Sequence, residues 1–430
     1  MAELIEVNKK DSVLDKIKKF ALNNMVTIMF VIICYIGFYF SNLTFAFFIN
    51  DLITRIARNS FLVLALIIPV LAGMGLNFAI VLGAMAGQVA IIMVTHWGIV
   101  GWQGFFLCVL ISAPLAIIFG YLTGKLLNKT KGQEMITSLI LGFFANGLYQ
   151  LVFLIMVGSV IPMHNETLLL SSGVGLRVSI DLTGGLKYAI DDLLRWTFPK
   201  TLMMLGSASI LIGGFNIYKY IKGVPNYLKG KIKLRMIGYV LAGISLVIYS
   251  IIITNSNSLL NNIKVPIITM VIIGLLCLFN IFISKAKIGQ DFRTVGQDRH
   301  VATVSGIKSD KVRVTAIVIS TLLAAWGQLF FLQNLGTLST YGSHEQVGMF
   351  AIAALLIGGA SVTKANIGHA LLGTVLFHTL FIVSPIAGKN LFGDAQLGEY
   401  FRAFVAYGVI GLSLGMHAWK KQLQSRRRLS

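Results

Sequence analysis

Charged residues are scarce in this chain. Only 12% of its 430 residues are Asp, Glu, Lys or Arg, and 56% are hydrophobic, whereas a soluble globular domain carries about 25% charged residues. None of the four charged types occurs between Phe61 and Gly124. That run is far longer than the ~20 apolar residues with which one helix crosses a bilayer. The composition excludes an ordinary soluble domain and predicts an all-α polytopic membrane protein.

Cysteine is also scarce, and the motifs of several chemistries are missing. The three cysteines, Cys34, Cys108 and Cys277, lie in apolar stretches, as small buried hydrophobic residues do. There is no H-E-x-x-H motif and no histidine pair at i, i+4 spacing. The stretch GYLTGKLL, residues 120–127, is one residue short of a phosphate-binding loop and lacks its Ser or Thr. We therefore expect no enzyme activity, metal or cofactor in this chain.

Carboxylates are rare inside the apolar stretches. A transporter driven by protons or ions usually keeps carboxylates or histidines within its spans. Here most acidic residues fall at span ends or in loops, and His96, His344 and His417 also lie near span ends. These absences favour a chain that is one subunit of a larger transport complex, with its energy supplied by another subunit. Two alternatives stay open, namely a self-sufficient secondary transporter or channel and a non-transporting membrane scaffold or receptor.

What the chain does contain is a series of apolar stretches separated by basic clusters. About twelve spans are expected, near 24–48, 59–75, 77–95, 102–124, 135–158, 201–218, 236–254, 265–284, 313–331, 346–360, 365–384 and 400–419. With twelve alternating spans, every basic cluster falls on one side, which the positive-inside rule assigns to the cytoplasm together with both termini. The net charge of +20 is thereby explained by topology rather than by nucleic-acid binding.

The longest segment on the opposite side is the extracytoplasmic loop 159–200. Its acidic residues include Asp181, Asp191 and Asp192. The stretch YAIDDLLRW within it has apolar residues at helical spacing, which indicates a short helix lying on the membrane surface. The loop is interpreted either as a structural cap or as a docking surface for an external partner, and these two readings stay open.

One apolar stretch, GMGLNFAIVLGAMAGQ at residues 73–88, is interrupted by glycines and amides. Broken spans expose backbone groups that can bind a polar solute where they line a cavity. The predicted helix-break residues are Gly73, Gly75, Gly83 and Gly87. The predicted substrate-path residues, which offer neutral donors and acceptors, are Asn77, Gln88, Asn146, Gln150, Gln328 and Gln333. The alternative for each amide is a bond that ties two helices together.

A later segment of the chain is weakly similar to this interrupted stretch. FAIVLGAMAGQ, from Phe78, and FAIAALLIGGA, from Phe350, share Phe-Ala-Ile and a glycine nine positions on, Gly87 and Gly359. In the twelve-span topology the two segments cross the membrane in opposite directions, as the halves of an inverted-topology repeat do. The pattern therefore indicates inverted repeats around a broken-helix core.

The cytoplasmic loop 286–311 carries the most specific pattern. Its segment FRTVGQDRHVATVSGIKSDKVRV resembles the coupling segment of ABC-transporter permeases for branched-chain amino acids, simple sugars and nucleosides. The matching residues are Arg293, Gly296, Ala302, Gly306, Ile307 and Lys308. Thr303 stands where that family has an alanine, and Gln297 and Asp298 lie near its usual Asn. The resemblance implies that this segment meets an ATPase.

Two further stretches support the same resemblance. KGQEMITSLILGFFANGLYQLV, residues 131–152, is similar to nucleoside-type permeases through Glu134, Ile136, Thr137 and Leu141. GMFAIAALLIGGASVTKANIGHALLGTVLF, residues 348–377, resembles another segment of the family, without its usual proline. The family usually has about ten spans, so residues 201–260 are interpreted as an inserted helix pair within one permease domain, 1–430.

The resemblance also implies the working arrangement. A permease of this type sits in the bacterial inner membrane, with residues 1–23 and the basic tail 420–430 in the cytoplasm. The expected partners are a cytoplasmic ABC ATPase that carries ATP and Mg, a second permease, related or identical, an extracytoplasmic substrate-binding protein and membrane lipid. The uncharged interior favours a nucleoside or simple sugar as the solute over a charged amino acid.

Overall fold

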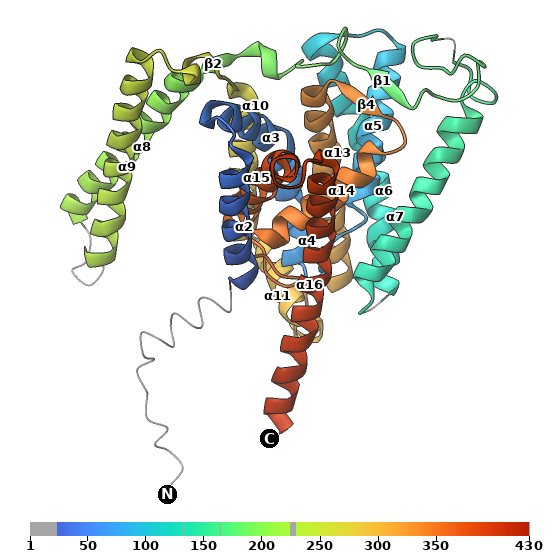
Figure 1. Ribbon diagram of the computed structural model, residues 1–430. Helices are drawn as coiled ribbons and strands as arrows, with labels where there is room; N and C mark the ends of the chain where they lie inside the picture. The colour runs from blue at the N-terminus through green and yellow to red at the C-terminus, as the bar shows by residue number, and fades with distance from the viewer. Residues whose placement is uncertain (1–23, 131, 164, 224–228, 430) are drawn as a thin grey trace, which may run out of the picture. The chain divides into compact units, whose positions relative to one another are not determined.

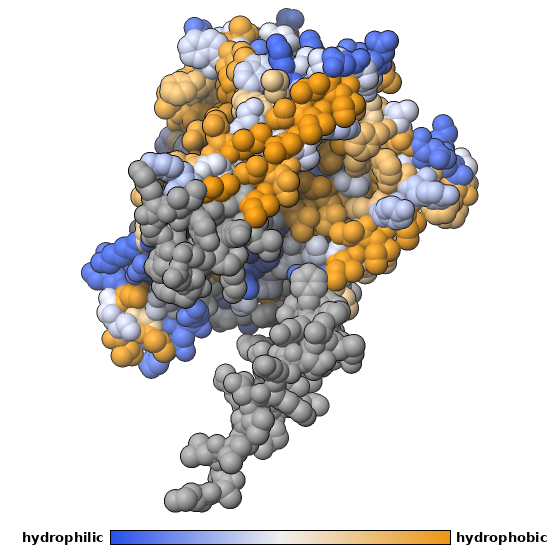
Figure 2. Space-filling view, turned by 90° about the vertical axis from the view of Figure 1, so that its left-hand side faces the viewer, coloured by the Kyte–Doolittle hydropathy of each residue, from blue (hydrophilic) through white to orange (hydrophobic). Residues whose placement is uncertain are grey.

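The computed structural model describes residues 24–130, 132–163, 165–223 and 229–429. The predicted N-terminal cytoplasmic segment 1–23 lies outside them, as does the last residue of the tail. Within these ranges, eight helices are long and apolar enough to cross a membrane, and three shorter apolar helices accompany them. Hydrophobic side chains form broad continuous areas on the face shown in Figure 2. The chain is a multi-pass helical membrane protein, which confirms the predicted fold class.

Most helices follow one another through short connections, whereas a long segment that includes β1 and β2 joins α7 to α8 (Figure 1). The elements of the first half are α2 (Met25–Ser41), α3 (Phe45–Ala65), α4 (Ile67–Leu71), α5 (Ile80–His96), α6 (Gly101–Lys129), α7 (Glu134–Leu151) with a π-helical turn (Val152–Met156), β1 (Ser179–Asp181) and β2 (Arg195–Thr197). Those of the second half are α8 (Phe198–Gly223), α9 (Lys229–Asn255), β3 (Lys264–Pro266), α10 (Ile267–Lys285), α11 (Lys287–Gln297), α12 (Arg299–Val304), α13 (Ser309–Leu335), β4 (Thr337–Ser339), α14 (Ser343–Ile357), α15 (Ile367–Phe392) and α16 (Ala395–Leu429).

Each predicted span coincides with a helical segment, but the first boundary was wrong. The apolar stretch 24–48 is not one helix, because α2 ends at Ser41 and α3 begins at Phe45. Asn42 caps α2 in the left-handed conformation, with a φ of 48°, which Asn tolerates better than most residues. The turn residues Ser41, Asn42 and Thr44 are polar, but they lie between two strongly apolar stretches, and the predicted span ran through them.

The chain divides into two compact units. Unit 1 contains residues 1–43, 55–189 and 272–430, and its core is built around α13. Helices α5 and α6 reach α13 closely because glycines face it. A Cβ on Gly83 would lie 2.4 Å from the carbonyl oxygen of Thr321, and one on Gly120 would lie 2.8 Å from the Cα of Val318. These are small-residue contacts of the kind that drives helix association in membranes.

The two ends of unit 1 differ in structure. At one end, the short helix α12 follows α11. At the other end, β1 and β4 form an antiparallel pair, with Ser179 opposite Ser339 and Asp181 opposite Thr337. Figure 1 shows α11 and the β1–β4 pair at opposite ends of the helices. We call them the α12 end and the β4 end. Beside β1, hydrogen bonds from the side chain and backbone of Thr183 lower the pKa of the exposed Asp181 carboxyl.

Unit 2 contains residues 44–54 and 190–271 and includes the predicted inserted pair 201–260. Helices α8 and α9 pack as a hairpin through Gly206 and Gly243, where an added Cβ on either would lie within 2.8 Å of the other's carbonyl oxygen. Strands β2 and β3 pair antiparallel beside them. The surface helix predicted for YAIDDLLRW is wrong, because only Asp191–Leu193 forms a single 3-10 turn and Arg195–Thr197 joins β2. The partner strand, more than sixty positions away, competes successfully with local helix propensity.

Candidate functional site

Two breaks in the helices of unit 1 lie against each other. The first, residues 72–79, separates α4 from α5, and the second, residues 358–366, separates α14 from α15. Gly73 and Gly75 hold left-handed backbone, with φ values of 70° and 68°, which explains why glycine occupies them. A Cβ on Gly75 would lie 3.6 Å from Val362. The stretch 73–88 is therefore a helix break followed by the first half of α5. Gly73 and Gly75 lie in the break as predicted, but the prediction is wrong for Gly83 and Gly87, which lie inside α5.

Helices α5 and α14, each next to one of these breaks, pack directly together. A Cβ on Gly348 would lie 2.8 Å from the side chain of Val81, so the contact requires glycine there. Farther from the breaks, Gln88, midway along α5, contacts His344 at the start of α14. Since α5 leads away from its break and α14 leads toward its own, the segments that begin at Phe78 and Phe350 run in opposite directions.

A chain of polar side chains joins α5, α14 and α7 toward the β4 end. Gln88 Oε1 lies 2.6 Å from His344 Nδ1, and His344 Nε2 lies 2.9 Å from Asn146 Oδ1. The Asn146 amide also donates to the carboxylate of Glu345. Gln88 and His344 are fully buried, where unpaired polar groups are costly. The three helices are thereby tied together, with the Glu345 carboxylate at the edge of the chain.

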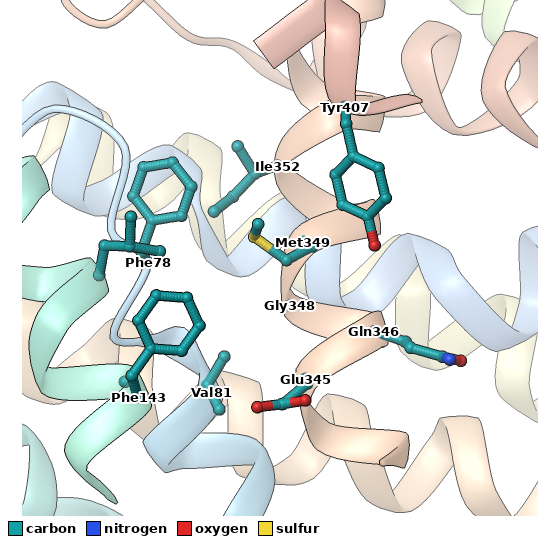
Figure 3. Close-up of a pocket in the computed structure, with 11 residues that line it drawn as sticks. Phe78, Val81, Phe143, Glu345, Gln346, Gly348, Met349, Ile352 and Tyr407 are labelled. Atoms are coloured by element: carbon teal, nitrogen blue, oxygen red, sulfur yellow. The ribbon is translucent and has the colours of Figure 1, made fainter. Parts of the chain in front are cut away.

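This carboxylate borders a cavity of about 280 Å³. In Figure 3 the rings of Phe78 and Phe143 lie near each other on one side of the cavity, and the ring of Tyr407 lies on the other. Met349 projects between them, and Glu345 lies at one end with its carboxylate directed toward the side of Val81 and Phe143. The lining thus combines aromatic faces with a single carboxylate, at the small end of the size range of ligand pockets.

The structure brings together only some of the predicted substrate-path residues. Gln88 and Asn146 meet in the polar chain, whereas Gln150 is exposed and Gln328 and Gln333 are buried on α13. None of these five lines the cavity. Asn77 lies in the break instead, where its Oδ1 accepts from the amide of Ala79, the residue before α5, at 3.1 Å. Gly83 and Gly87 face the backbone of α13. A contact of any of these residues with solute stays a prediction.

Sequence reasoning missed the residues that line the cavity. Glu345, Phe143 and Tyr407 were not named as site residues, and Phe78 was noted only as the start of the repeated segment. His344, beside Glu345, was noted only as a residue near a span end. The signal available was the pair His344-Glu345 directly before the predicted span 346–360, because two titratable side chains at the start of a span are rare.

At the α12 end, the predicted coupling residues form a compact turn. Asp298 caps α12 by accepting from the amides of His300 and Val301 at 2.8 and 3.0 Å, the usual role of an N-cap aspartate. Ala302 is fully buried, while Val301 and Val304 are 54% and 75% exposed. Gly306, with a φ of 82°, ends the turn before Ile307 and Lys308. The segment thus presents two valines outward on a firmly capped helix.

The remaining coupling residues, Arg293 and Gly296, face the protein itself. The Arg293 guanidinium donates to the carbonyl oxygens of Ser284 and Gly289. The Cβ of any larger residue at Gly296 would lie 2.3 Å from the Leu71 carbonyl oxygen and 2.9 Å from the Gly73 nitrogen. The α11–α12 segment is therefore in backbone contact with the first helix break.

An ion pair extends this contact to α7. Arg313, near the start of α13, lies 2.5 Å from Glu134 at the start of α7, and its Nε lies 2.7 Å from the sulfur of Met74 in the break. The side chains of Arg313 and Glu134 are 4% and 16% exposed. On the other side, Arg299 of α12 pairs with Asp310 of α13. Charged contacts thus run from α12 through α13 to α7, which borders the cavity.

Part of the chain matches a known protein family. Residues 246–413 match the family described as branched-chain amino acid transport system / permease component. This segment runs from the last turns of α9 to α16 and includes α11, α12 and α14.

Three curated proteins match shorter stretches. The chain is 27% identical to the fructose import permease protein FruF of Bifidobacterium longum over 27% of its own length and 31% of the relative's. It is 27% identical to the high-affinity branched-chain amino acid transport system permease protein BraD of Pseudomonas aeruginosa over 31% of its length and 39% of the relative's. It is 33% identical to a probable ABC transporter permease protein of Sinorhizobium fredii, over 33% of its length and 43% of the relative's. The matched parts thus cover less than half of each relative, and no solved structure matches the chain.

Proposed function

We propose that this chain, whose residues 246–413 match the family described as branched-chain amino acid transport system / permease component, is the membrane-spanning permease subunit of an ABC importer for a small polar solute. It would lie in a bacterial inner membrane with its α12 end in the cytoplasm. ATP and Mg would be bound by a separate ATPase at that end. A second permease, related or identical, would complete the path, and a substrate-binding protein would deliver solute at the β4 end.

The observation that carries this proposal is the exposed pair Val301 and Val304 on α12. Large apolar side chains on a charged, water-facing segment suit a groove on another protein. The Asp298 cap and the buried Ala302 hold the short helix in place without a partner. Such a preformed helix can transmit a movement of the ATPase to the spans instead of absorbing it.

The contacts behind α12 supply a route for that movement. Gly296 lies against Gly73, so a shift of α11 would displace the break before α5. The ion pair of Arg313 and Glu134 would carry the same shift to α7. Because α5, α7 and α14 all line the cavity, the route would end at the place where solute is held.

The cavity lining supports a nucleoside or simple sugar as the solute. Aromatic faces such as those of Phe78 and Phe143 stack on planar bases and on the apolar faces of sugar rings. The Glu345 carboxylate, an acceptor with two oxygens, can receive hydrogen bonds from hydroxyl groups. The chain's similarity to a fructose import permease is consistent with a sugar, and its similarity to a branched-chain amino acid permease names the competing solute class.

The test is to purify the chain together with the ATPase encoded beside it. Val304→Asp places a charge at a residue that is 75% exposed, so folding is spared while an apolar contact is lost. Under the proposal, the ATPase no longer co-purifies with this variant and solute uptake into vesicles stops. Val178→Asp, a matched change at the β4 end where Val178 is 64% exposed, retains the ATPase. Unchanged co-purification with Val304→Asp would overturn the assignment of α12.

A further inference from the structure

A second, larger hollow lies between α6 and α13, toward the α12 end, and nothing in the proposed transport route uses it. Its volume is about 1020 Å³. Its floor is formed where the two helices touch, because a Cβ on Gly120 or Gly124 would lie within 2.9 Å of the Cα of Val318 or Val314. Larger side chains on either side of this line of contact form the walls.

The walls are apolar and open to the surroundings. Ile117, Ile118 and Leu122 of α6 are 45%, 53% and 59% exposed. The outward face of α6 continues this surface through Phe106 and Leu110, at 59% and 55%. In a chain that spans a membrane, such a face contacts hydrocarbon, and an apolar groove within it suits an acyl chain rather than a polar solute.

The end of the groove nearest α12 is positively charged. Lys125, Lys129 and Lys311 line it and are all exposed. Lys125 and Lys129 lie four residues apart on α6, so they share one face of that helix. The nearby carboxylate, Asp310, is already paired with Arg299. Across the part of the chain that the structure describes, these three ammonium groups have no carboxylate partner.

We propose that this groove binds one anionic phospholipid of the leaflet at the α12 end, with an acyl chain between α6 and α13 and its phosphate at Lys125, Lys129 and Lys311. Charge complementarity selects the occupant, because an apolar groove that ends in three cations matches an amphiphile with a negative head. The lysine stems lie along the apolar wall and raise their ammonium groups to headgroup level. The lipid would brace α6 against the helix that follows α12.

The experiment is native mass spectrometry of the purified full chain with phosphatidylglycerol or phosphatidylcholine added in equal amounts. We expect one phosphatidylglycerol to be retained in preference to phosphatidylcholine. The triple variant Lys125→Gln, Lys129→Gln, Lys311→Gln should lower the apparent affinity for phosphatidylglycerol roughly a hundredfold, since each lysine near a headgroup contributes several-fold. The matched triple variant Lys285→Gln, Lys287→Gln, Lys364→Gln removes the same charge elsewhere and should keep the lipid.

A second variant tests the acyl groove. Ile118→Gln should weaken retention of phosphatidylglycerol although every lysine is kept, because a polar group then interrupts the wall. Equal retention of both lipids by the unaltered chain would overturn the proposal, and so would unchanged retention in the first triple variant. Equal loss of phosphatidylglycerol in both triple variants would also overturn it, because the lipid would then respond to the net charge of the chain and not to this groove. Efficient disulfide cross-linking of two copies through Ile118→Cys would assign the groove to a second permease instead.

Discussion

The backbone of Gly73, in the break before α5, lies directly against the backbone of Gly296, in the last turn of α11. No side chain separates the segment proposed to meet the ATPase from the segment that begins the solute path. A rigid contact of this kind moves both partners together, because packed interiors do not deform continuously.

Gly296→Ala should uncouple the two segments. The new methyl group would lie 2.3 Å from the Leu71 carbonyl oxygen, so α11 must shift away from the break. We expect ATP hydrolysis by the assembled complex to continue while solute uptake falls severalfold. Gly274→Ala on α10, where an added Cβ meets nothing within 4 Å, is the control and should transport normally. Full uptake by Gly296→Ala would show that the contact carries no movement.

Arg313 and Glu134 each neutralise the other's buried charge, so we expect the loss of one partner to destabilise the chain more than the loss of both. Removing either partner alone, as in Arg313→Met or Glu134→Leu, should cost about 3–5 kcal/mol. The double variant Arg313→Met, Glu134→Leu should recover much of that loss in thermal unfolding followed in detergent. If the losses of the two single changes simply add in the double variant, the ion pair is not energetically coupled.

Glu345→Gln should lower uptake of the transported solute by about tenfold or more, because a hydrogen bond to a charged group contributes about 1.5–3 kcal/mol. Phe143→Leu keeps the apolar volume but removes the ring face. A nucleoside should suffer more from this second change than a simple sugar does, since a base gains more from stacking. Uptake assays in vesicles with both solute classes measure the difference. Equal, unchanged uptake in both variants would remove the cavity from the path.

Gln88→Ala should destabilise the meeting of α5 and α14. It leaves the buried His344 ring without its partner at Nδ1, at a cost of about 1–3 kcal/mol. Uptake should fall as well, because the polar chain that positions Glu345 starts at Gln88. Gln150→Ala, on the exposed face of α7, serves as control for amide removal.

Asn77→Ala separates two roles of an amide in the helix break. Loss of the hydrogen bond that Asn77 accepts from the buried Ala79 amide predicts a decrease in stability of about 1–3 kcal/mol with solute selectivity unchanged. A changed ratio of uptake between two solutes would instead place Asn77 on the path, as its sequence context suggested. Competition uptake at matched protein levels distinguishes these results.

The spans could be predicted because hydrophobic length and basic loops constrain them strongly. Their exact ends could not, since a polar turn as short as Ser41–Thr44 between apolar residues does not by itself separate two helices from one. The pairing of Arg195–Thr197 with Lys264–Pro266 was equally hidden, because it depends on residues far apart in the chain.

The candidate site was less accessible than the fold. Residue type predicted the helix break at Gly73 and Gly75, but the same argument failed at Gly83 and Gly87, which lie inside α5 against α13. The approach of Gly296 to Gly73 required the folded chain, as did the meeting of His344 with Gln88 and Asn146, because residues from helices distant in sequence create both. Amide side chains in apolar stretches indicate buried hydrogen bonds, but sequence does not specify whether the partner is solute or another helix.

Ser339 connects the β4 end to the polar chain. Its backbone pairs with Ser179 in the β1–β4 ribbon, and its carbonyl oxygen accepts from the Gln88 amide at 3.4 Å. Two residues on, the Tyr341 hydroxyl donates to the Leu176 carbonyl oxygen at 3.0 Å. A protein that bound to the loop before β1 and displaced it would therefore also displace α5 and α14 around His344. Under the proposed function, the same few side chains would respond to the binding protein at the β4 end and to motion of the ATPase at the α12 end.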